Sequence, residues 1–377
     1  MKTIVSSKLF ASSVDRVSLV IGKCIIPVTD YIKIEVKSGI MQITATDLDN
    51  EVTEMLQVED QGDFSFLVEA VRIKSILKGV KDCPLVIELT EKQLPIDPDK
   101  PDKPAKIELF VTFQVGAINF NLPALDIDEF PKPARIEEGS KFQINAADLK
   151  TGLLKCIPFT GTDALREVMT GVYVEVNQTG IRTTATDAHK LVRYNSPGFE
   201  RSDEMAGHIL NKKTATVLSK SLENGPVYCE SDGVTLVLNY GFMTVASHLI
   251  FGQYPRVDWV IPTDLNITAQ VNRLELLNVL KSAPVSRVTK QVNFSINGKF
   301  DIWCNDIDFG TEFKTAIDHV HTGDDITIGF NRDFLVSVLK NTVNPQVQLQ
   351  MSAPNRAVLI DSDPGVLSLI MPVLIKG

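Results

Sequence analysis

Apolar residues along the chain recur with two periods, one typical of helices and one typical of strands. From Ser7 to Lys23 they return every three or four residues, at Leu9, Phe10, Val14 and Val17 among others, as on the buried face of a helix. The same reasoning predicts six helices in all, over residues 7–23, 69–81, 146–157, 211–223, 272–282 and 331–341.

Between these helices, short β-branched segments with alternating apolar positions predict strands. We place them at 30–36, 40–45, 51–58, 85–89, 107–115, 118–122, 172–176, 181–185, 227–229, 235–238, 242–249, 292–296, 299–304, 347–351, 357–361 and 367–371. A Pro/Asp/Lys-rich segment, 94–106, separates two strands of one unit, so it is predicted to be a long exposed hairpin loop.

Two helices and small sets of strands recur three times along the chain. A Pro- and acid-rich segment, 123–141, separates the first two groups, and Tyr254-Pro255 opens a second linker. Helices packed on one side of antiparallel sheets would bury these apolar faces, which predicts an α+β fold. We expect three domains, over residues 1–133, 134–258 and 259–377.

One strand-turn-strand motif also recurs. Thr-Ala-Thr-Asp stands at 44–47 and again at 184–187, and a weaker copy ends in Asn305-Asp306. Short polar side chains such as Thr186 and Asp187 bind their own backbone in turns, so a single copy indicates a β-turn. The Asp positions are about a third of the chain apart, which is the spacing of domains.

The second copy, Thr-Ala-Thr-Asp-Ala-His-Lys-Leu at 184–191, resembles the Ala-Thr-Asp-Gly-His-Arg-Leu signature of bacterial DNA sliding clamps, the β subunit of DNA polymerase III. Three other family landmarks follow in the right order, at 251–262, 328–331 and 370–373. The resemblance implies a DNA clamp fold that closes head to tail into a homodimeric ring around double-stranded DNA. It also implies a processivity factor whose partners are the polymerase III catalytic subunit, the clamp loader and other proteins with clamp-binding motifs.

Charge is unevenly spread over the predicted elements. The chain carries a net charge of −9, but the six predicted helices hold 16 basic and 6 acidic residues. If these helices line one cavity, the cavity attracts DNA phosphates, with contacts to the backbone and independent of sequence. The candidate DNA contacts are Lys23, Arg72, Lys78, Lys150, Lys155, Arg166, Lys212, Lys213, Arg273, Lys281 and Arg332.

In the family, a cleft between the middle and last domains binds short peptide motifs of partners. An apolar pocket with a few polar groups suits a peptide with one or two hydrophobic anchors. Carried over by motif, its residues here are Met169, Thr186, Ala188, His189, Leu191, Pro255, Trp259, Val260, Asn331, Phe334, Leu369, Met371, Pro372 and Val373. For Leu191 and Val260, the alternative to a role in the cleft is ordinary packing in the hydrophobic core.

This sequence departs from the family pattern at three places. Ala188 stands where Gly is usual, and Trp259 stands where Arg is usual, which indicates a different motif preference. The positions of the subunit interface, aromatic and aliphatic in the family, are Ala117, Asn119, Ala283 and Pro284. A clamp-fold paralogue that binds peptides without encircling DNA is therefore the alternative function.

We find no catalytic or metal-binding constellation in the sequence. His319 and His321 would share one strand face, but no further ligand is evident, and the five cysteines form no Cys-x-x-Cys pair. A phosphate-binding glycine loop and a Gly-x-Ser-x-Gly elbow are also missing. We expect a protein without enzymatic activity, metal or cofactor. With neither a membrane-length apolar run nor a signal-peptide core, it is expected to be cytoplasmic and not bound to membranes.

Overall fold

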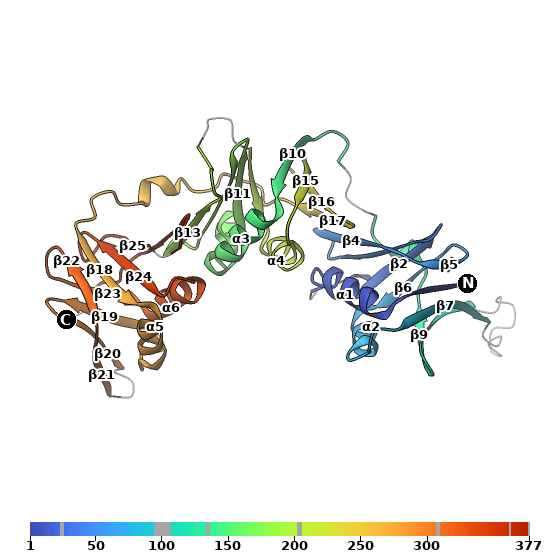
Figure 1. The fold of residues 1–377 in the computed structure, drawn as a ribbon, viewed down its shortest axis with the longest axis horizontal. Coiled ribbons are helices and arrows are strands. Elements are labelled where there is room, and N and C mark those ends of the chain that lie inside the picture. The colour runs from blue at the N-terminus through green and yellow to red at the C-terminus, as the bar shows by residue number, and fades with distance from the viewer. Residues whose placement is uncertain are drawn as a thin grey trace. The chain divides into compact units, whose positions relative to one another are not determined.

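The computed structural model describes residues 1–22, 26–93, 107–132, 136–201, 206–306, 310–361 and 363–375. The chain divides into two compact units. Unit 1 comprises Met1–Ala146 and Thr216–Leu249, and unit 2 comprises Ala147–Ala215 and Ile250–Gly377. Figure 1 labels the elements of both units.

Six α-helices lie within the described residues, and a strand comes directly before each of them. The helices are α1 (Ser7–Val17), α2 (Ala70–Leu77), α3 (Ala146–Cys156), α4 (Lys212–Ser221), α5 (Arg273–Ser282) and α6 (Arg332–Asn341). Short 3-10 helices are η1 (Pro27–Asp30), η2 (Ile127–Glu129), η3 (Ile157–Phe159), η4 (Ala164–Thr170) and η5 (Val257–Val260).

Unit 1 contains two antiparallel sheets. The five-stranded sheet runs in the order β5 (Glu59–Gln61), β1 (Lys2–Ser6), β7 (Pro84–Gln93), β8 (Ile107–Val115) and β9 (Ile118–Ala124). The eight-stranded sheet runs in the order β10 (Ser140–Asn145), β15 (Pro226–Ser231), β16 (Thr235–Tyr240), β17 (Met243–His248), β4 (Asn50–Gln57), β3 (Ile40–Thr46), β2 (Tyr31–Lys37) and β6 (Phe64–Glu69).

Unit 2 also contains two antiparallel sheets. The nine-stranded sheet runs in the order β14 (Ala206–Leu210), β11 (Val172–Asn177), β12 (Gly180–Thr186), β13 (Lys190–Asn195), β26 (Val366–Ile370), β25 (Val358–Asp361), β24 (Gln346–Met351), β18 (Ile267–Asn272) and β22 (His319–Thr322). The four-stranded sheet runs in the order β21 (Thr311–Ile317), β20 (Phe300–Asp306), β19 (Gln291–Ile296) and β23 (Ile326–Asn331).

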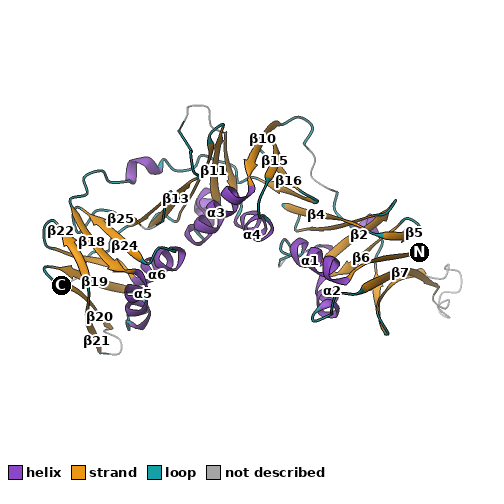
Figure 2. Cartoon of the chain, in the orientation of Figure 1, coloured by secondary structure: helices purple, strands orange, loops and turns teal. Residues whose placement is uncertain are grey.

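Within each unit, paired helices pack on strands of both sheets (Figure 2). In unit 1, α1 and α2 contact each other, and α1 contacts β1 of one sheet and β3 and β4 of the other. In unit 2, α5 and α6 pack together against β18 and β26 of one sheet and β21 and β23 of the other. Fully buried aromatic rings fill the space between these layers, among them Phe10 and Phe113 in unit 1 and Phe294, Phe300 and Phe330 in unit 2.

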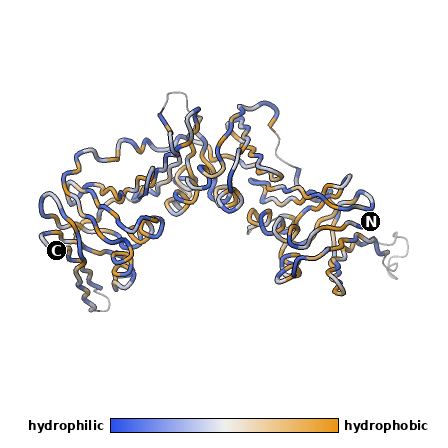
Figure 3. The backbone as a smooth tube through the Cα atoms, in the orientation of Figure 1, coloured by the Kyte–Doolittle hydropathy of each residue, from blue (hydrophilic) through white to orange (hydrophobic). Residues whose placement is uncertain are grey.

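The hydropathy pattern explains this layering. Strands such as β2 and β11 alternate buried and half-buried residues, as expected for a sheet with one face in the core. Figure 3 shows hydrophobic and hydrophilic residues interspersed along both units. None of the described helices combines the length and the apolar character needed to cross a membrane.

All six predicted helices are present, and two of them are shorter than predicted by five or more residues. The first helix ends at Val17, because the next residues form tighter turns in which Leu19 N–H donates to Arg16 O and Val20 N–H to Val17 O. The second ends at Leu77, because Lys78 adopts an extended backbone and Gly79 a positive φ of 81°.

Most predicted strands are present within two or three residues, but the strands directly before the helices were missed. They are β1, β6, β10, β14, β18 and β23, and β10 begins inside the predicted linker 123–141. These strands have five or six residues and lead into the helix with at most one residue between, so the change of period hides them. The hairpin predicted around 94–106 is confirmed by the pairing of β7 with β8, in which Gln93 faces Ile107. The loop itself lies outside the described residues.

Candidate functional site

The repeated Thr-Ala-Thr-Asp motif builds a hairpin turn. Between β12 and β13, Thr186 Oγ donates to Lys190 O at 2.9 Å and accepts from Ala188 N–H at 3.1 Å. One oxygen of Asp187 accepts from His189 N–H and Lys190 N–H, both at 2.9 Å. The turn therefore satisfies its own backbone and holds His189 outward, exposed at the surface.

The first copy of the motif makes the same turn between β3 and β4. Thr46 Oγ donates to Asn50 O at 2.8 Å and accepts from Leu48 N–H at 3.0 Å, and Asp47 accepts from Asn50 N–H at 2.8 Å. The weaker third copy ends β20 at Asp306, which is 7% exposed, and residues 307–309 lie outside the described chain. The motif is a structural turn in the first two repeats.

Ala188 occupies a backbone conformation that L-residues with a side chain rarely adopt. Its φ is +74°, and Leu48 at the equivalent turn position has φ +82°. Glycine reaches this left-handed region without a steric cost, which gives a physical reason for Gly at this position in the family signature.

The floor of the candidate cleft lies where two parts of unit 2 share one sheet. β13 pairs with β26, and Leu191 faces Leu369. Both side chains are 2% exposed and belong to an apolar cluster with Ile209, Tyr254 and Val257. Leu191 and Leu369 therefore form a buried apolar floor where the two strands meet.

Tyr254 is a floor residue that the motif comparison did not include. Its hydroxyl accepts a hydrogen bond from Thr186 N–H at 3.1 Å, and its ring stacks on Tyr173 with centroids 4.9 Å apart. Burial raises the pKa of Tyr254 well above its usual value, so the hydroxyl stays protonated. The sequence pattern that could have revealed Tyr254 as a cleft residue is the aromatic-proline pair Tyr254-Pro255, which we interpreted only as the start of a linker.

The C-terminal segment forms a second wall of the cleft. Met371 N–H donates to His189 O at 2.8 Å, and Val373 N–H donates to Gly329 O at 2.8 Å. The segment thus passes from the nine-stranded sheet to β23 of the four-stranded sheet. Pro372 stands between the two donors, where no N–H is needed.

Exposed groups surround this floor. The His189 and Phe334 rings stack with centroids 5.8 Å apart. A surface cavity of about 180 Å³ lies beside His189 and Met169 and is also lined by Arg166. Trp259 is 79% exposed and Val260 is 53% exposed, so both offer apolar surface. Of the other predicted cleft residues, Thr186 is buried, Ala188 is exposed, and Met169, Pro255, Asn331, Phe334, Met371, Pro372 and Val373 are half-buried.

Asp258 anchors the short helix that carries Trp259. Its carboxylate accepts from Arg193 at 2.7 Å and from Arg201 at 3.0 Å. Burial alone would raise the pKa of Asp258, but these two guanidinium groups hold it below its usual value. Sequence reasoning missed this contact, because Arg193 and Asp258 are 65 residues apart and no local pattern links them.

Eight of the eleven predicted DNA-contact residues fall into three groups by their contacts. Arg72, Arg166 and Arg332 form surface ion pairs with Glu69, Asp163 and Asp333. The side chains of Lys78, Lys150 and Lys281 form no ion pair or hydrogen bond within the described chain. Lys212 and Lys213 begin α4, and Lys23 lies outside the described residues.

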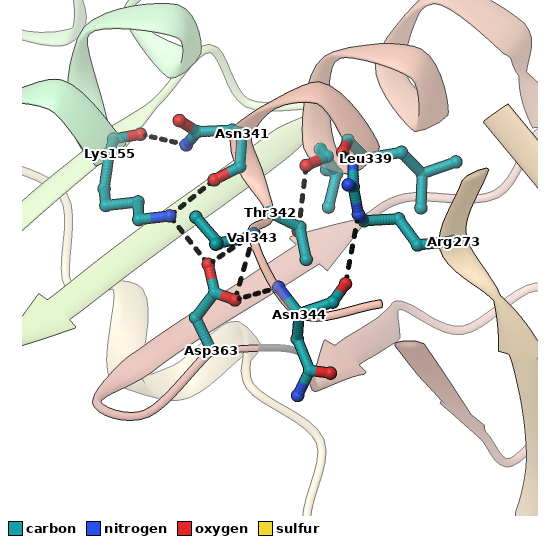
Figure 4. Close-up of polar contacts among 9 residues, drawn as sticks. Lys155, Arg273, Leu339, Asn341, Thr342, Val343, Asn344 and Asp363 are labelled. Atoms are coloured by element: carbon teal, nitrogen blue, oxygen red, sulfur yellow. Dashed lines mark hydrogen bonds and ion pairs between the residues drawn. The ribbon is translucent and has the colours of Figure 1, made fainter. Parts of the chain in front are cut away.

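Lys155 and Arg273 form the third group, and both bind protein groups instead of solvent (Figure 4). Lys155 Nζ donates to Asn341 O and to Asp363 at 2.7 Å. Arg273 donates to Leu339 O and Asn344 O at 3.1 and 3.0 Å. Two predicted DNA contacts thus serve to bind carbonyl groups at the C-terminal end of α6.

The predicted interface residues lie on two different elements. Ala117 is in the exposed turn before β9, and Asn119 is an exposed residue of β9, an edge strand of its sheet. Ala283 caps the end of α5 and is 2% exposed, so little of its side chain can reach a partner, and Pro284 is half-buried.

No cluster of three or more His, Cys, Asp or Glu side chains in the described residues has the geometry of a metal site. His319 and His321 lie near each other on β22, with ring centroids 6.1 Å apart. Burial raises the pKa of the Cys156 and Cys229 thiols to about 12, so both stay protonated at neutral pH.

Three family models match the chain in order. They are the N-terminal domain of the DNA polymerase III β subunit over residues 1–134, its central domain over 144–256 and its C-terminal domain over 258–374. The β sliding clamp of Bacillus subtilis is 24% identical over 98% of both chains, and that of Vibrio cholerae is 23% identical over 93% of both.

Solved structures agree with this fold. The DNA polymerase III β subunit of Thermotoga maritima superposes over both full chains with a TM-score of 0.87 at 21% identity. The sliding clamp of Bartonella birtlesii does so with a TM-score of 0.86 at 23% identity. These likenesses define the three-domain α+β DNA clamp fold. The chain belongs to the DNA polymerase III β subunit family, the bacterial DNA sliding clamps.

Proposed function

We propose that this protein closes head to tail with a second copy into a ring around double-stranded DNA, and that it tethers the replicative polymerase there. The observation that carries the proposal is the match of all three β subunit domains, in order, over nearly the whole chain. Its role is to keep partners on DNA, and it does so without catalysing a reaction itself, in the cytoplasm.

The test is retention on circular DNA. A purified clamp loader should place the protein on a closed DNA circle in an ATP-dependent step, and cutting the circle should release it. Retention that does not depend on closure of the DNA would contradict encirclement. A chain that binds partner peptides but is never retained would instead be the clamp-fold paralogue, the alternative function.

The helices support weak, sequence-independent contact with DNA. The observed helices α1 to α6 contain 13 basic and 4 acidic side chains, whereas the whole chain has a net charge of −9. Within the predicted set, Lys78, Lys150 and Lys281 keep ammonium groups without a protein partner among the described residues. We propose that these three lysines, together with Lys212 and Lys213, contact DNA phosphates. Lys155 and Arg273 are left out because their side chains bind protein groups.

Exposed sheet edges support the subunit contact. Among the described strands, β9 pairs only with β8, and β21 pairs only with β20. A β9 edge of one copy and a β21 edge of the next would pair their free backbone groups. The predicted interface residues lie beside these strands. Ala117 comes directly before β9. Ala283 follows α5, and α5 contacts β21.

We also propose that the apolar cleft of unit 2 binds the peptide motifs of the polymerase, the clamp loader and other partners. The buried floor at Leu191 and Leu369, with exposed groups such as His189 and Trp259 around it, suits a hydrophobic anchor. A charge at the half-buried Met371 (Met371→Asp) should abolish peptide binding, and with it loading by the clamp loader, while leaving the mass of the dimer in solution unchanged. We propose the three domains of residues 1–133, 134–258 and 259–377 as the units of this assembly.

A further inference from the structure

A surface cavity in unit 1 is lined by the ends of two helices and by a hairpin turn. Its volume is about 650 Å³, within the range of ligand-binding pockets, and all of its lining residues belong to unit 1. Arg16 comes from the last turn of α1, Ser221 is the last residue of α4, and Phe242 lies in the turn between β16 and β17. The carbonyl groups at the C-terminal ends of helices favour a positive charge nearby.

The charged side chains that line this cavity sum to −1. Arg16 donates two hydrogen bonds to the buried carboxylate of Glu54, one of them at 2.7 Å. These bonds raise the pKa of Arg16, and the charge of Glu223 acts in the same direction. Arg16 therefore neutralises Glu54, whereas the exposed carboxylate of Glu223 forms no ion pair or hydrogen bond in the described part of the chain. One carboxylate is thus left for a cation from outside.

Exposed aromatic rings line the same cavity. Phe242 is 74% exposed and Tyr228 is 58% exposed, so both offer ring surface to a ligand. The face of an aromatic ring attracts a guanidinium or ammonium group, and its apolar area packs well on aliphatic side chains. Carboxylate and rings together therefore suit a cation that stands beside an apolar group.

Hydrogen bonds hold the two segments that carry Glu223 and Phe242. The Tyr240 hydroxyl accepts from Glu223 N–H at 3.2 Å and donates to Asn224 O at 3.1 Å. Met55 N–H, on the neighbouring strand β4, donates to Phe242 O at 3.0 Å. The backbone of both segments is therefore in place before a ligand arrives, which lowers the entropic cost of binding.

We propose that this cavity is a second partner-binding site, which accepts an arginine side chain of a partner protein together with an adjacent apolar residue. The guanidinium group donates to the Glu223 carboxylate and stacks on an exposed ring, and the apolar residue packs on the remaining ring surface. Partner segments with an acidic residue in place of the arginine meet the charge of Glu223 and are disfavoured. The inference goes beyond the proposed function, because it adds a partner contact in unit 1 to the peptide cleft of unit 2.

Methionine methyl groups can report binding at each site separately. Met243 lines the cavity, whereas Met169 and Met371 lie at the cleft. In NMR spectra of the full chain with isotopically labelled methionine methyls, the acetylated and amidated dipeptide Leu-Arg should shift the Met243 signal in a saturable manner. The same dipeptide with citrulline, which has the shape of arginine without its charge, should bind there about three- to fivefold more weakly. Added salt should reduce this preference.

Variants then assign the preference to the cavity. Glu223→Gln should make the two dipeptides bind equally and leave the affinity for the citrulline dipeptide unchanged. Phe242→Ala should weaken the binding of both, because the exposed ring is lost. Glu88→Gln, the same loss of charge at an exposed position of β7 in the other sheet of unit 1, is the matched control and should keep the preference.

Three results would overturn the proposal. They are the lack of a saturable Met243 shift, equal binding of the two dipeptides to the wild-type protein, and a preference that survives Glu223→Gln. Spermidine that shifts Met243 as strongly as the arginine dipeptide would also overturn it, because a free polyamine would then be the ligand. Each of these results leaves the ring and the cleft standing, since those are tested by retention on DNA circles and by Met371→Asp.

Discussion

At the scale of single residues, two side chains fix the shape of the turn between β12 and β13 by hydrogen bonds to the backbone of that turn. Thr186 and Asp187 together engage backbone groups from Ala188 to Lys190, so the Asp next to His189 has a structural role. His189 is left to stack on Phe334 at the cleft. An Asp-x-His sequence that could suggest acid–base chemistry is here a turn with one exposed ring.

Ala188→Gly should stabilise the protein. A left-handed backbone costs an alanine about 1 to 2 kcal/mol, and glycine avoids this cost but loses more freedom on folding. We therefore expect a gain of about 0.5 to 1 kcal/mol in the free energy of unfolding, measured by urea denaturation. Ala185→Gly, at a buried strand position with ordinary φ, is the control and should destabilise; a destabilising Ala188→Gly would contradict the strain at this turn.

At the scale of elements, the recurring unit is a short strand that runs directly into a helix. Ser6, Asn272 and Asn331 end such strands, and each side chain accepts a hydrogen bond from a backbone N–H of the first helical turn. These residues are good N-caps and end an alternating pattern, so strand and helix meet without a loop. Asn331 is also a predicted cleft residue, but its side-chain oxygen already accepts a hydrogen bond from Asp333 N–H in the first turn of α6.

Lys155 ties α3 to the end of α6 and to the turn before β26. Its side chain is 13% exposed and that of Asp363 is 10% exposed, so Lys155→Met leaves a largely buried carboxylate without its cation. We expect a loss of about 3 kcal/mol in the free energy of unfolding, measured by urea denaturation. Lys150→Met, on the same helix but without an ion pair in the described chain, should change stability by less than about 0.5 kcal/mol. Equal effects of the two substitutions would mean that the ion pair contributes nothing.

The same contact predicts a pH dependence. Burial alone would raise the pKa of Asp363, but Lys155 and the backbone N–H groups of Asn344 and Val343 hold it below its usual value. A carboxyl with a lowered pKa adds stability above its unfolded pKa of about 4 and loses it as the pH falls through the folded value. The stability advantage of the wild-type protein over Lys155→Met should therefore be constant near neutral pH and shrink on acidification, as the buried Asp363 carboxyl of the variant takes up its proton. An advantage that grows on acidification would contradict this assignment.

At the scale of the whole molecule, charge and free sheet edges matter more than any single contact. Basic residues are concentrated on the helices of a chain that is acidic in total, which favours weak contact with DNA phosphates through the helices. Such contacts exchange readily, so lasting retention on DNA requires closure of a ring. The subunit contact is therefore the feature on which function depends most.

Ile118→Asp should break the ring. Ile118 is 58% exposed on the edge strand β9, where a charge would have to be buried against the partner copy. We expect the wild-type protein to sediment near twice the 41.6 kDa mass of one chain at micromolar concentration, and the variant near one. Val234→Asp, at a 63% exposed position between β15 and β16, should leave the dimer intact. A wild-type protein that is monomeric at micromolar and nanomolar concentration would favour the paralogue function.

Local patterns in the sequence determined the helices, most strands, the repeat and the hairpin motif, because periodicity and turn chemistry act over a few residues. They did not reveal the strands before the helices, whose few residues merge with the helical period.

Only the tertiary structure decided which polar side chains are free. Lys155 and Lys150 look alike in sequence, yet one binds Asp363 and Asn341, 186 or more residues away, and the other has no partner in the described chain. Likewise Leu191 and Val260 share an apolar character, but pairing with β26 buries the first, while the second is exposed on η5. Such outcomes depend on contacts between distant segments, and therefore no local pattern of residues contains them.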